Sequence, residues 1–211
     1  MAKKETAFGS GPGYQHYKAL GKKVANSRDR KALEDYVKLM LSEKPIDQQR
    51  AAAVCQNVSD LRPEMFLHHL PALVRAIDRP AHSAVYRTVF RLLSMLDLPE
   101  SHSGKIVDLA FHNLSDPKQP TGIKVFAMTV ISNQALQYPE LARELSLVLE
   151  GQYKSGSAGF RNRAEKIAKK HGFSLQAWPI PVYFYRRSRL IKGSDLKQKK
   201  FLDFRYFRND L

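Results

Sequence analysis

The chain has 211 residues, with 35 Lys and Arg against 20 Asp and Glu, so its formal net charge is +15. This length fits one domain, and a hydrophobic fraction of 43% is enough for a continuous core, which excludes a fibrous or wholly disordered protein. The sequence has no apolar signal-peptide core and no run of 18 apolar residues, so it predicts a cytoplasmic protein without a membrane span. The basic excess favours an acidic partner: nucleic acid, an anionic membrane surface or an acidic protein.

The basic excess is concentrated at the two ends of the chain. Residues 1–31 and 172–211 each carry a net charge of +6, whereas residues 32–171 carry only +3. Residues 1–30 are rich in Gly and Lys and have few apolar anchors, so we expect a flexible basic N-terminal lead there. A helical domain is expected over residues 31–172, followed by an irregular basic aromatic extension over residues 173–211.

Apolar residues recur at helical spacing through the central part of the chain. A first short helix is expected to end before Pro45. The next helix is expected to begin with Asp47 as its N-cap, and its partner begins at Pro63. On these two helices we expect the following side chains to face the core: Ala51, Val54, Cys55, Val58, Phe66, Leu67, Leu70, Leu73, Val74 and Ile77.

Two further helix pairs follow in the same pattern. They are expected from Val85 to Leu114 and from Ile123 to Gly151, with Gly151 ending the second pair. A last basic helix over about residues 159–171 is closed by Gly172. Because Cys55 falls on an expected core position, we interpret it as a buried packing residue and not as a reactive thiol.

Basic residues recur along these helices at an interval of 37 residues: Arg50, Arg87, Lys124 and Arg161. Each interval also contains a Pro-Glu pair, which opens the following apolar run at Pro63, Pro99 and Pro139. A self-similar period near 37 is typical of a solenoid that is built from helix pairs. The sequence therefore predicts an all-α architecture.

Between about residues 45 and 171 the pattern resembles the HEAT repeat family, which is close to the armadillo repeats. In that family an Asp near a helix end is followed by an Arg or Lys on the next helix, and the corresponding residues here are Asp47 with Arg50, Asp78 with Arg87, and Asp116 with Lys124. The resemblance implies a right-handed solenoid of about three to four helix pairs, in which this ladder is structural and stacks between units. The last unit departs from the pattern because no Asp precedes Arg161. The loop from Gly156 to Arg163 is also similar to that of small bacterial HEAT-like proteins of unassigned function.

A Gly- and Ser-rich loop before the last helix is a candidate anion site. Free backbone N–H groups and two guanidinium groups there would suit a phosphate or a carboxylate. The candidate residues are Ser155, Ser157, Gly159, Arg161 and Arg163. The alternative is a flexible connection between helices.

The C-terminal extension contains a second candidate site, for a partner or for nucleic acid. Arginine side chains attract phosphates and neighbouring aromatic rings stack on bases, as in proteins that bind single strands. The candidate residues are Tyr183, Tyr185, Arg186, Arg187 and Arg189. The alternative is an amphipathic end-piece that packs on the solenoid.

No motif for enzymatic chemistry is present in the sequence. The seven His residues include no pair at helical metal-binding spacing, because the adjacent His68 and His69 point about 100° apart on a helix. Walker, nucleophile-elbow and dinucleotide motifs are absent as well. We therefore predict no catalytic residue, no metal and no cofactor.

The first functional hypothesis is a monomeric, non-enzymatic interaction module, a scaffold or adaptor for a protein or peptide partner. The alternative is a nucleic-acid-binding protein. The resemblance also admits a relative of the HEAT-like alkylpurine DNA glycosylases, which use aromatic groove residues. This relationship is less favoured, because Trp178, the one Trp of the chain, lies beyond the solenoid.

Overall fold

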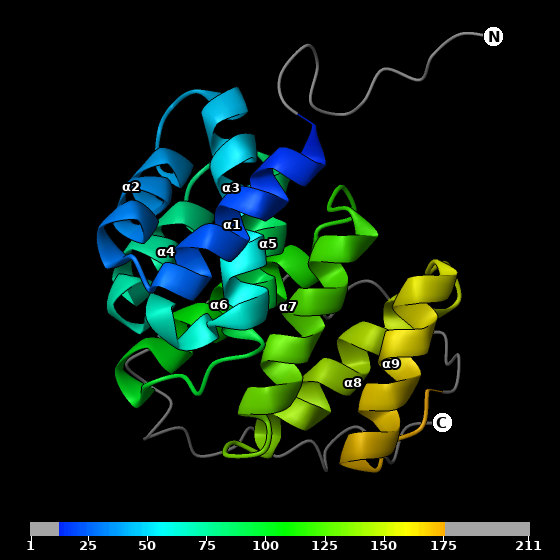
Figure 1. Ribbon diagram of the computed structural model, residues 1–211. Coiled ribbons are helices and arrows are strands. Elements are labelled where there is room, and N and C mark those ends of the chain that lie inside the picture. Colours follow the sequence, from blue (N-terminus) through cyan, green and yellow to red (C-terminus); the bar gives the residue numbers. More distant parts are fainter. Residues whose placement is uncertain (1–12, 176–211) are drawn as a thin grey trace, which may run out of the picture. The chain divides into compact units, whose positions relative to one another are not determined.

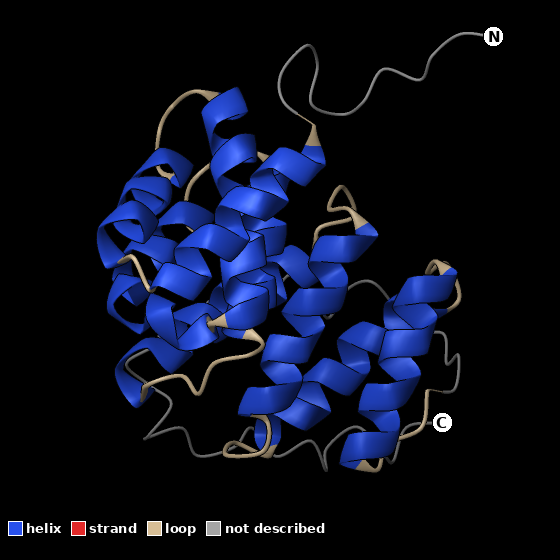
Figure 2. Cartoon of the chain, in the orientation of Figure 1, coloured by secondary structure: helices blue, strands red, loops and turns tan. Residues whose placement is uncertain are grey.

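A computed structural model describes residues 13–175, which are almost entirely helical. This part of the chain forms α-helices and one 3-10 helix. Figures 1 and 2 show helices and loops and no strand in it. The predicted all-α class is confirmed. In chain order the elements are α1 (Tyr14–Ser27), α2 (Arg30–Met40), α3 (Pro45–Leu61), η1 (Pro63–His69), α4 (Leu70–Ile77), α5 (Ser83–Leu93), α6 (Glu100–Ser115), α7 (Thr121–Gln134), α8 (Glu140–Tyr153) and α9 (Ala158–His171).

The helices are arranged in two layers, as a solenoid requires. The first layer consists of α1, α3, α5, α7 and α9, which pack side by side in chain order (Figure 1). The second layer consists of α2, η1 with α4, α6 and α8. Helix α6 packs mainly on α7, which follows it, and not on α5, with which the sequence pattern pairs it.

The first-layer helices from α3 to α9 run parallel to one another. Hydrogen bonds join equivalent positions of neighbouring helices: Thr88 Oγ1 donates to the Ala52 carbonyl at 3.3 Å, and Asn133 Nδ2 donates to the Ser94 carbonyl at 2.9 Å. In the last pair, Lys170 Nζ donates to Asn133 Oδ1 at 3.2 Å. These partners are 36 to 39 residues apart in the sequence, close to the interval of the basic ladder.

The expected flexible lead over residues 1–30 is wrong for its second half, because α1 occupies Tyr14–Ser27 and is part of the first layer. Its buried residues are Tyr17, Gly21, Val24 and Ala25. A Cβ atom at Gly21 would lie 2.6 Å from Asn57 Cβ and 2.8 Å from the Val54 carbonyl oxygen. Small residues therefore let the α1 backbone lie directly on α3, so the helix docks with few large apolar side chains.

The helix expected from Pro63 begins as a 3-10 helix and becomes an α-helix only at Leu70. Pro71 has no N–H and cannot donate to the Leu67 carbonyl, so the Leu70 N–H donates to that carbonyl instead. This tighter turn leaves the Leu67 side chain 44% exposed, whereas Phe66 is fully buried. The predicted core position of Leu67 is therefore wrong.

Two helix boundaries also differ from the expected ones. Helix α3 begins at Pro45 with Lys44 as its N-cap, so Asp47 lies in the first turn and is not the cap. Helix α8 continues through Gly151 to Tyr153, because nothing at Gly151 forces a left-handed backbone. Gly172 does end α9 as predicted, with a positive φ of 72°.

One continuous core runs between the two layers. The other predicted core side chains of α3 and α4 are buried, and Cys55 is fully enclosed. Burial raises the pKa of the Cys55 thiol far above its usual value, so the thiol stays protonated. This confirms the interpretation of Cys55 as a packing residue.

Candidate functional site

Charge is divided unequally between the two layers. The first-layer helices carry twelve Lys and Arg against three Asp and Glu, a net charge of +9. The second-layer helices carry six against eight, a net charge of −2. Within residues 32–171 the first-layer helices contribute +6 and the second-layer helices −4, so the near neutrality of the central sequence is the sum of a basic layer and an acidic one.

The first layer presents one solvent-facing surface, which we call the outer face. On α3, α5, α7 and α9 its residues follow at intervals of three or four positions, which is the spacing of one helix face. All of them except Ala53 are exposed or half-buried. The outer face comprises Gln49, Ala53, Gln56 and Asp60 of α3, Ser83, Arg87, Arg91 and Ser94 of α5, Gly122, Phe126, Thr129 and Asn133 of α7, and Gly159, Arg163, Lys166 and Lys170 of α9.

The single acidic residue of the outer face, Asp60, is neutralised by a neighbouring arginine. Arg91 donates to Asp60 Oδ1 from both Nε, at 2.9 Å, and Nη2, at 2.6 Å. The same guanidinium lies over the Phe126 ring, with its carbon 5.5 Å from the ring centroid. The remaining charges on the face are all positive: Arg87, Arg163, Lys166 and Lys170. The outer face can therefore attract an anionic surface with no carboxylate left to oppose it.

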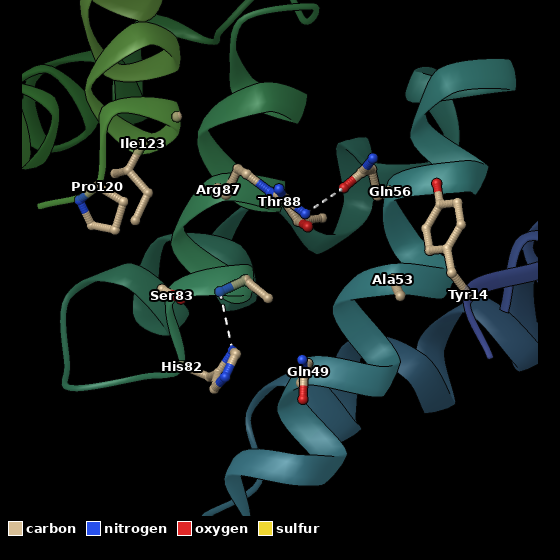
Figure 3. Close-up of a pocket in the computed structure, with 12 residues that line it drawn as sticks. Tyr14, Gln49, Ala53, Gln56, His82, Ser83, Arg87, Thr88, Pro120 and Ile123 are labelled. Carbon is tan, nitrogen blue, oxygen red and sulfur yellow. Dashed lines mark hydrogen bonds between the residues drawn. The ribbon is translucent and has the colours of Figure 1, made fainter. Parts of the chain in front are cut away.

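A groove of about 380 Å³ opens on the outer face between α3, α5 and α7. Figure 3 shows Tyr14 and the α3 residues on one side, and Pro120 and Ile123 of α7 on the other. Its lining is Tyr14, Gln49, Ala53, Gln56, His82, Ser83, Ala84, Arg87, Thr88, Pro120, Gly122 and Ile123. The groove leaves no signal in the sequence, because its residues come from four helices and share no local motif.

Arg87 is the arginine of this groove. Its Nη2 donates to Gln56 Oε1 over a long distance of 3.4 Å, and no carboxylate of the described residues pairs with it. A Cβ at Gly122 would lie 3.6 Å from Arg87 Cδ, so the glycine leaves space beside the arginine stem. Nearby, His82 Nδ1 accepts from the Ala84 N–H at 3.1 Å and caps the start of α5. The Arg87 guanidinium thus has most of its donors available to a ligand.

The ladder residues occupy equivalent positions of parallel helices, yet their side chains have different partners. Lys124 Nζ donates to Gln152 Oε1 at 2.7 Å, and burial lowers the pKa of Lys124 against a smaller opposing effect of Asp116. Asp78 forms its ion pair with Lys105 of α6 at 2.8 Å, since both lie in the second layer.

Arg50 differs again, because its buried Nε has no hydrogen-bond partner among the described residues. Within residues 13–175, none of the three expected pairs, Asp47 with Arg50, Asp78 with Arg87, or Asp116 with Lys124, is an ion pair.

The polar groups of the Gly- and Ser-rich loop bond mainly to the protein itself. Ser157 caps α9 by accepting from the Phe160 N–H at 3.3 Å and donates to Thr121 Oγ1 at 3.2 Å. Arg161 Nη1 donates to the Gly156 carbonyl at 2.7 Å, and Ser155 Oγ donates to the Gln152 carbonyl at 3.3 Å. Of the five candidates, Arg163 lies on the outer face together with Gly159, and the other three hold the loop against α7 and α8.

The second candidate set, Tyr183, Tyr185, Arg186, Arg187 and Arg189, lies outside the described residues. Within the described part, no three His, Cys, Asp or Glu side chains gather as metal ligands would. No helix of this part is both long and apolar enough for a transmembrane segment.

Comparison with known proteins identifies the family. Residues 13–171 match the HEAT repeat domain, and this match covers most of the chain. The chain therefore belongs to the HEAT repeat family, and the match begins at α1, in agreement with the packing of that helix. No curated protein and no solved structure matches the chain. Membership in this family indicates a repeat-based interaction module.

Proposed function

We propose that this HEAT repeat module binds nucleic acid through the outer face of its first layer. The observation that carries the proposal is the charge of that face. Among residues 13–175, four cations of this face have no carboxylate partner, and its one acidic residue, Asp60, is bound by Arg91. Phosphate groups supply a matching row of negative charges, and binding releases their counterions.

A uniformly charged partner suits this face better than a protein surface of mixed charge. Protein interfaces usually have a core depleted of charged residues and rich in apolar ones. The most exposed apolar side chain of the described residues, Leu136, does not belong to the outer face, nor does the exposed Leu147 of α8. The chain ends add further basic charge, with +6 over residues 172–211.

The second candidate function is a scaffold or adaptor for a protein or peptide, which the sequence by itself favours. Family membership favours it, because HEAT repeats are interaction modules. The same basic face would then require a strongly acidic partner. A nucleic-acid partner and an acidic protein partner differ in one measurable property, the binding of oligonucleotides.

The test is the salt dependence of oligonucleotide binding, measured by fluorescence anisotropy. One triple variant removes three cations of the outer face: Arg163→Gln, Lys166→Gln and Lys170→Gln. The matched control removes three exposed second-layer cations: Arg30→Gln, Lys31→Gln and Arg75→Gln. Both variants lower the net charge equally, so a difference between them reports where the charge lies.

We expect the outer-face variant to reduce the slope of log affinity against log salt by up to about 2 for a single strand, at about 0.7 per phosphate contact. The control variant is expected to leave the slope nearly unchanged. Equal effects of the two variants would contradict the proposal, because attraction would then depend on net charge alone. No binding to single- or double-stranded oligonucleotides at low salt would also contradict it and would leave the protein-partner hypothesis.

A further inference from the structure

We infer that the groove between α3, α5 and α7 holds one nucleotide of a single-stranded nucleic acid, with Arg87 on its phosphate and Tyr14 beside its base. This inference rests on the proposed function and assigns a specific contact within it. The remaining cations of the outer face would then bind neighbouring phosphates of the same strand.

The dimensions of the groove fit one nucleotide. Its volume of about 380 Å³ is at the lower end of the range for small-molecule sites, about 300–1,000 Å³. A duplex keeps its bases stacked inside the helix and presents only its phosphates and groove edges. A single strand can turn a base out of the stack and into a recess of this size.

The lining offers a separate surface for each part of a nucleotide. Pro120 is exposed and Ala84 is half-buried, so these two residues supply apolar surface for a base, whereas Ala53 and Ile123 are buried in the wall of the groove. The Gln49 and Gln56 side chains carry amide groups of the kind that read base edges. Tyr14 lies on the α3 side with 41% of its side chain exposed, so its ring is accessible for stacking (Figure 3).

The position of Arg87 fixes where the phosphate would lie. It is the one Arg or Lys of the lining, and its single hydrogen bond within the described chain, to Gln56, is long enough to yield to a stronger acceptor. A guanidinium binds phosphate through two parallel N–H donors, which gives a bond stronger than one to a neutral amide. Helix α7 begins at this groove without a side-chain cap, so its first N–H groups add to the positive potential.

The experiment compares a short labelled single strand of mixed sequence with the matching duplex. Arg87→Gln removes the proposed phosphate ligand, and Gly122→Leu fills the groove without changing any charge. Lys166→Gln is the matched control, because it removes one cation of the same outer face on α9, which does not line the groove. A second filling variant, Ala84→Leu, is used if Gly122→Leu lowers the melting temperature.

We expect the single strand to bind the unaltered protein more tightly than the duplex. Gly122→Leu should weaken single-strand binding at least about fivefold, the loss expected when one base no longer stacks, and should leave duplex binding unchanged. Arg87→Gln should weaken the single strand more than the duplex, whereas Lys166→Gln should weaken both by a similar small factor.

Three results would overturn the inference. The first is equal affinity for single strand and duplex in the unaltered protein, and the second is single-strand binding that both filling variants leave intact. The third is that poly-glutamate displaces the oligonucleotide from the unaltered protein but not from the Gly122→Leu variant. This result would assign the groove to an acidic peptide. If oligonucleotides still bind through Arg163, Lys166 and Lys170 while the groove variants have no effect, only the groove assignment fails and the proposed function stands.

Discussion

Replacing Gly21 by Ala tests directly whether α1 belongs to the folded domain. An ideal Cβ at this position would lie 2.6 Å from Asn57 Cβ and 2.8 Å from the Val54 carbonyl oxygen. Carbon atoms in contact are normally about 3.5–4.0 Å apart. Neither neighbouring atom is the end of a flexible side chain, so the clash can be relieved only if α1 moves about 1 Å away from α3.

The expected cost combines two opposing effects. Overpacking of a close contact costs about 1–3 kcal/mol. The better helix propensity of Ala returns up to about 1 kcal/mol. Gly21→Ala should therefore lower the free energy of unfolding by up to about 2 kcal/mol. Gly151→Ala is the matched control, because Gly151 lies inside α8 with nothing within 4 Å of its ideal Cβ, and it should raise stability by about 0.5–1 kcal/mol.

Urea denaturation measures both variants, and limited trypsin digestion at Lys18, Lys22 and Lys23 reports whether α1 detaches locally. Faster cleavage in Gly21→Ala than in Gly151→Ala is expected. If Gly21→Ala is as stable as Gly151→Ala and resists trypsin equally, α1 does not pack on α3. Residues 14–27 would then belong to a flexible lead, as the sequence predicted.

Three further predictions concern the core, a buried carboxylate and the C-terminal arginines. Leu92→Ala should lower the free energy of unfolding by about 2–5 kcal/mol, because Leu92 is almost fully buried; a loss under about 0.5 kcal/mol in chemical denaturation would show that its helix face is misassigned. Burial, and to a smaller extent the charge of Asp108, raises the pKa of Glu144. The folded state therefore holds the carboxyl proton of Glu144 more tightly than the unfolded state, and the stability that this proton contributes is lost as pH rises through the folded pKa. Glu144→Gln should therefore stabilise the protein at pH 7, with a gain that shrinks on acidification in thermal melts, whereas Glu140→Gln on the same helix should not stabilise it. Neutralising Arg186, Arg187 and Arg189 together should reduce the slope of log affinity against log salt for oligonucleotide binding by up to about 2. An unchanged slope at unchanged thermal stability would remove these arginines from the interface.

Helical periodicity determined most of the fold from the sequence alone. Apolar positions such as Val54 and Leu92 recur at helix spacing and are buried, because a helix in a solenoid exposes one face and covers the other. The 37-residue interval predicted the stacking of equivalent helices. Periodicity failed where backbone geometry and not side-chain hydrophobicity decided the packing, as at Gly21 and around Pro71. The helical spacing of Tyr17, Gly21, Val24 and Ala25, at i, i+4, i+7 and i+8, was the signal that could have revealed α1.

The candidate site depended on tertiary structure for a different reason. The sequence shows the net charge, but helices of the basic layer and of the acidic layer alternate along the chain, so most of their charge cancels over residues 32–171. Only stacking separates the two layers, since it places alternate helices side by side and brings Arg87 of α5 to the same face as the cations of α9. The groove likewise combines Tyr14, Gln56, Arg87 and residues of α7 from four helices. The sequence determined which helices form, and the packing of those helices decided which side chains meet, because contacts between residues about 37 positions apart exist only in the stacked solenoid.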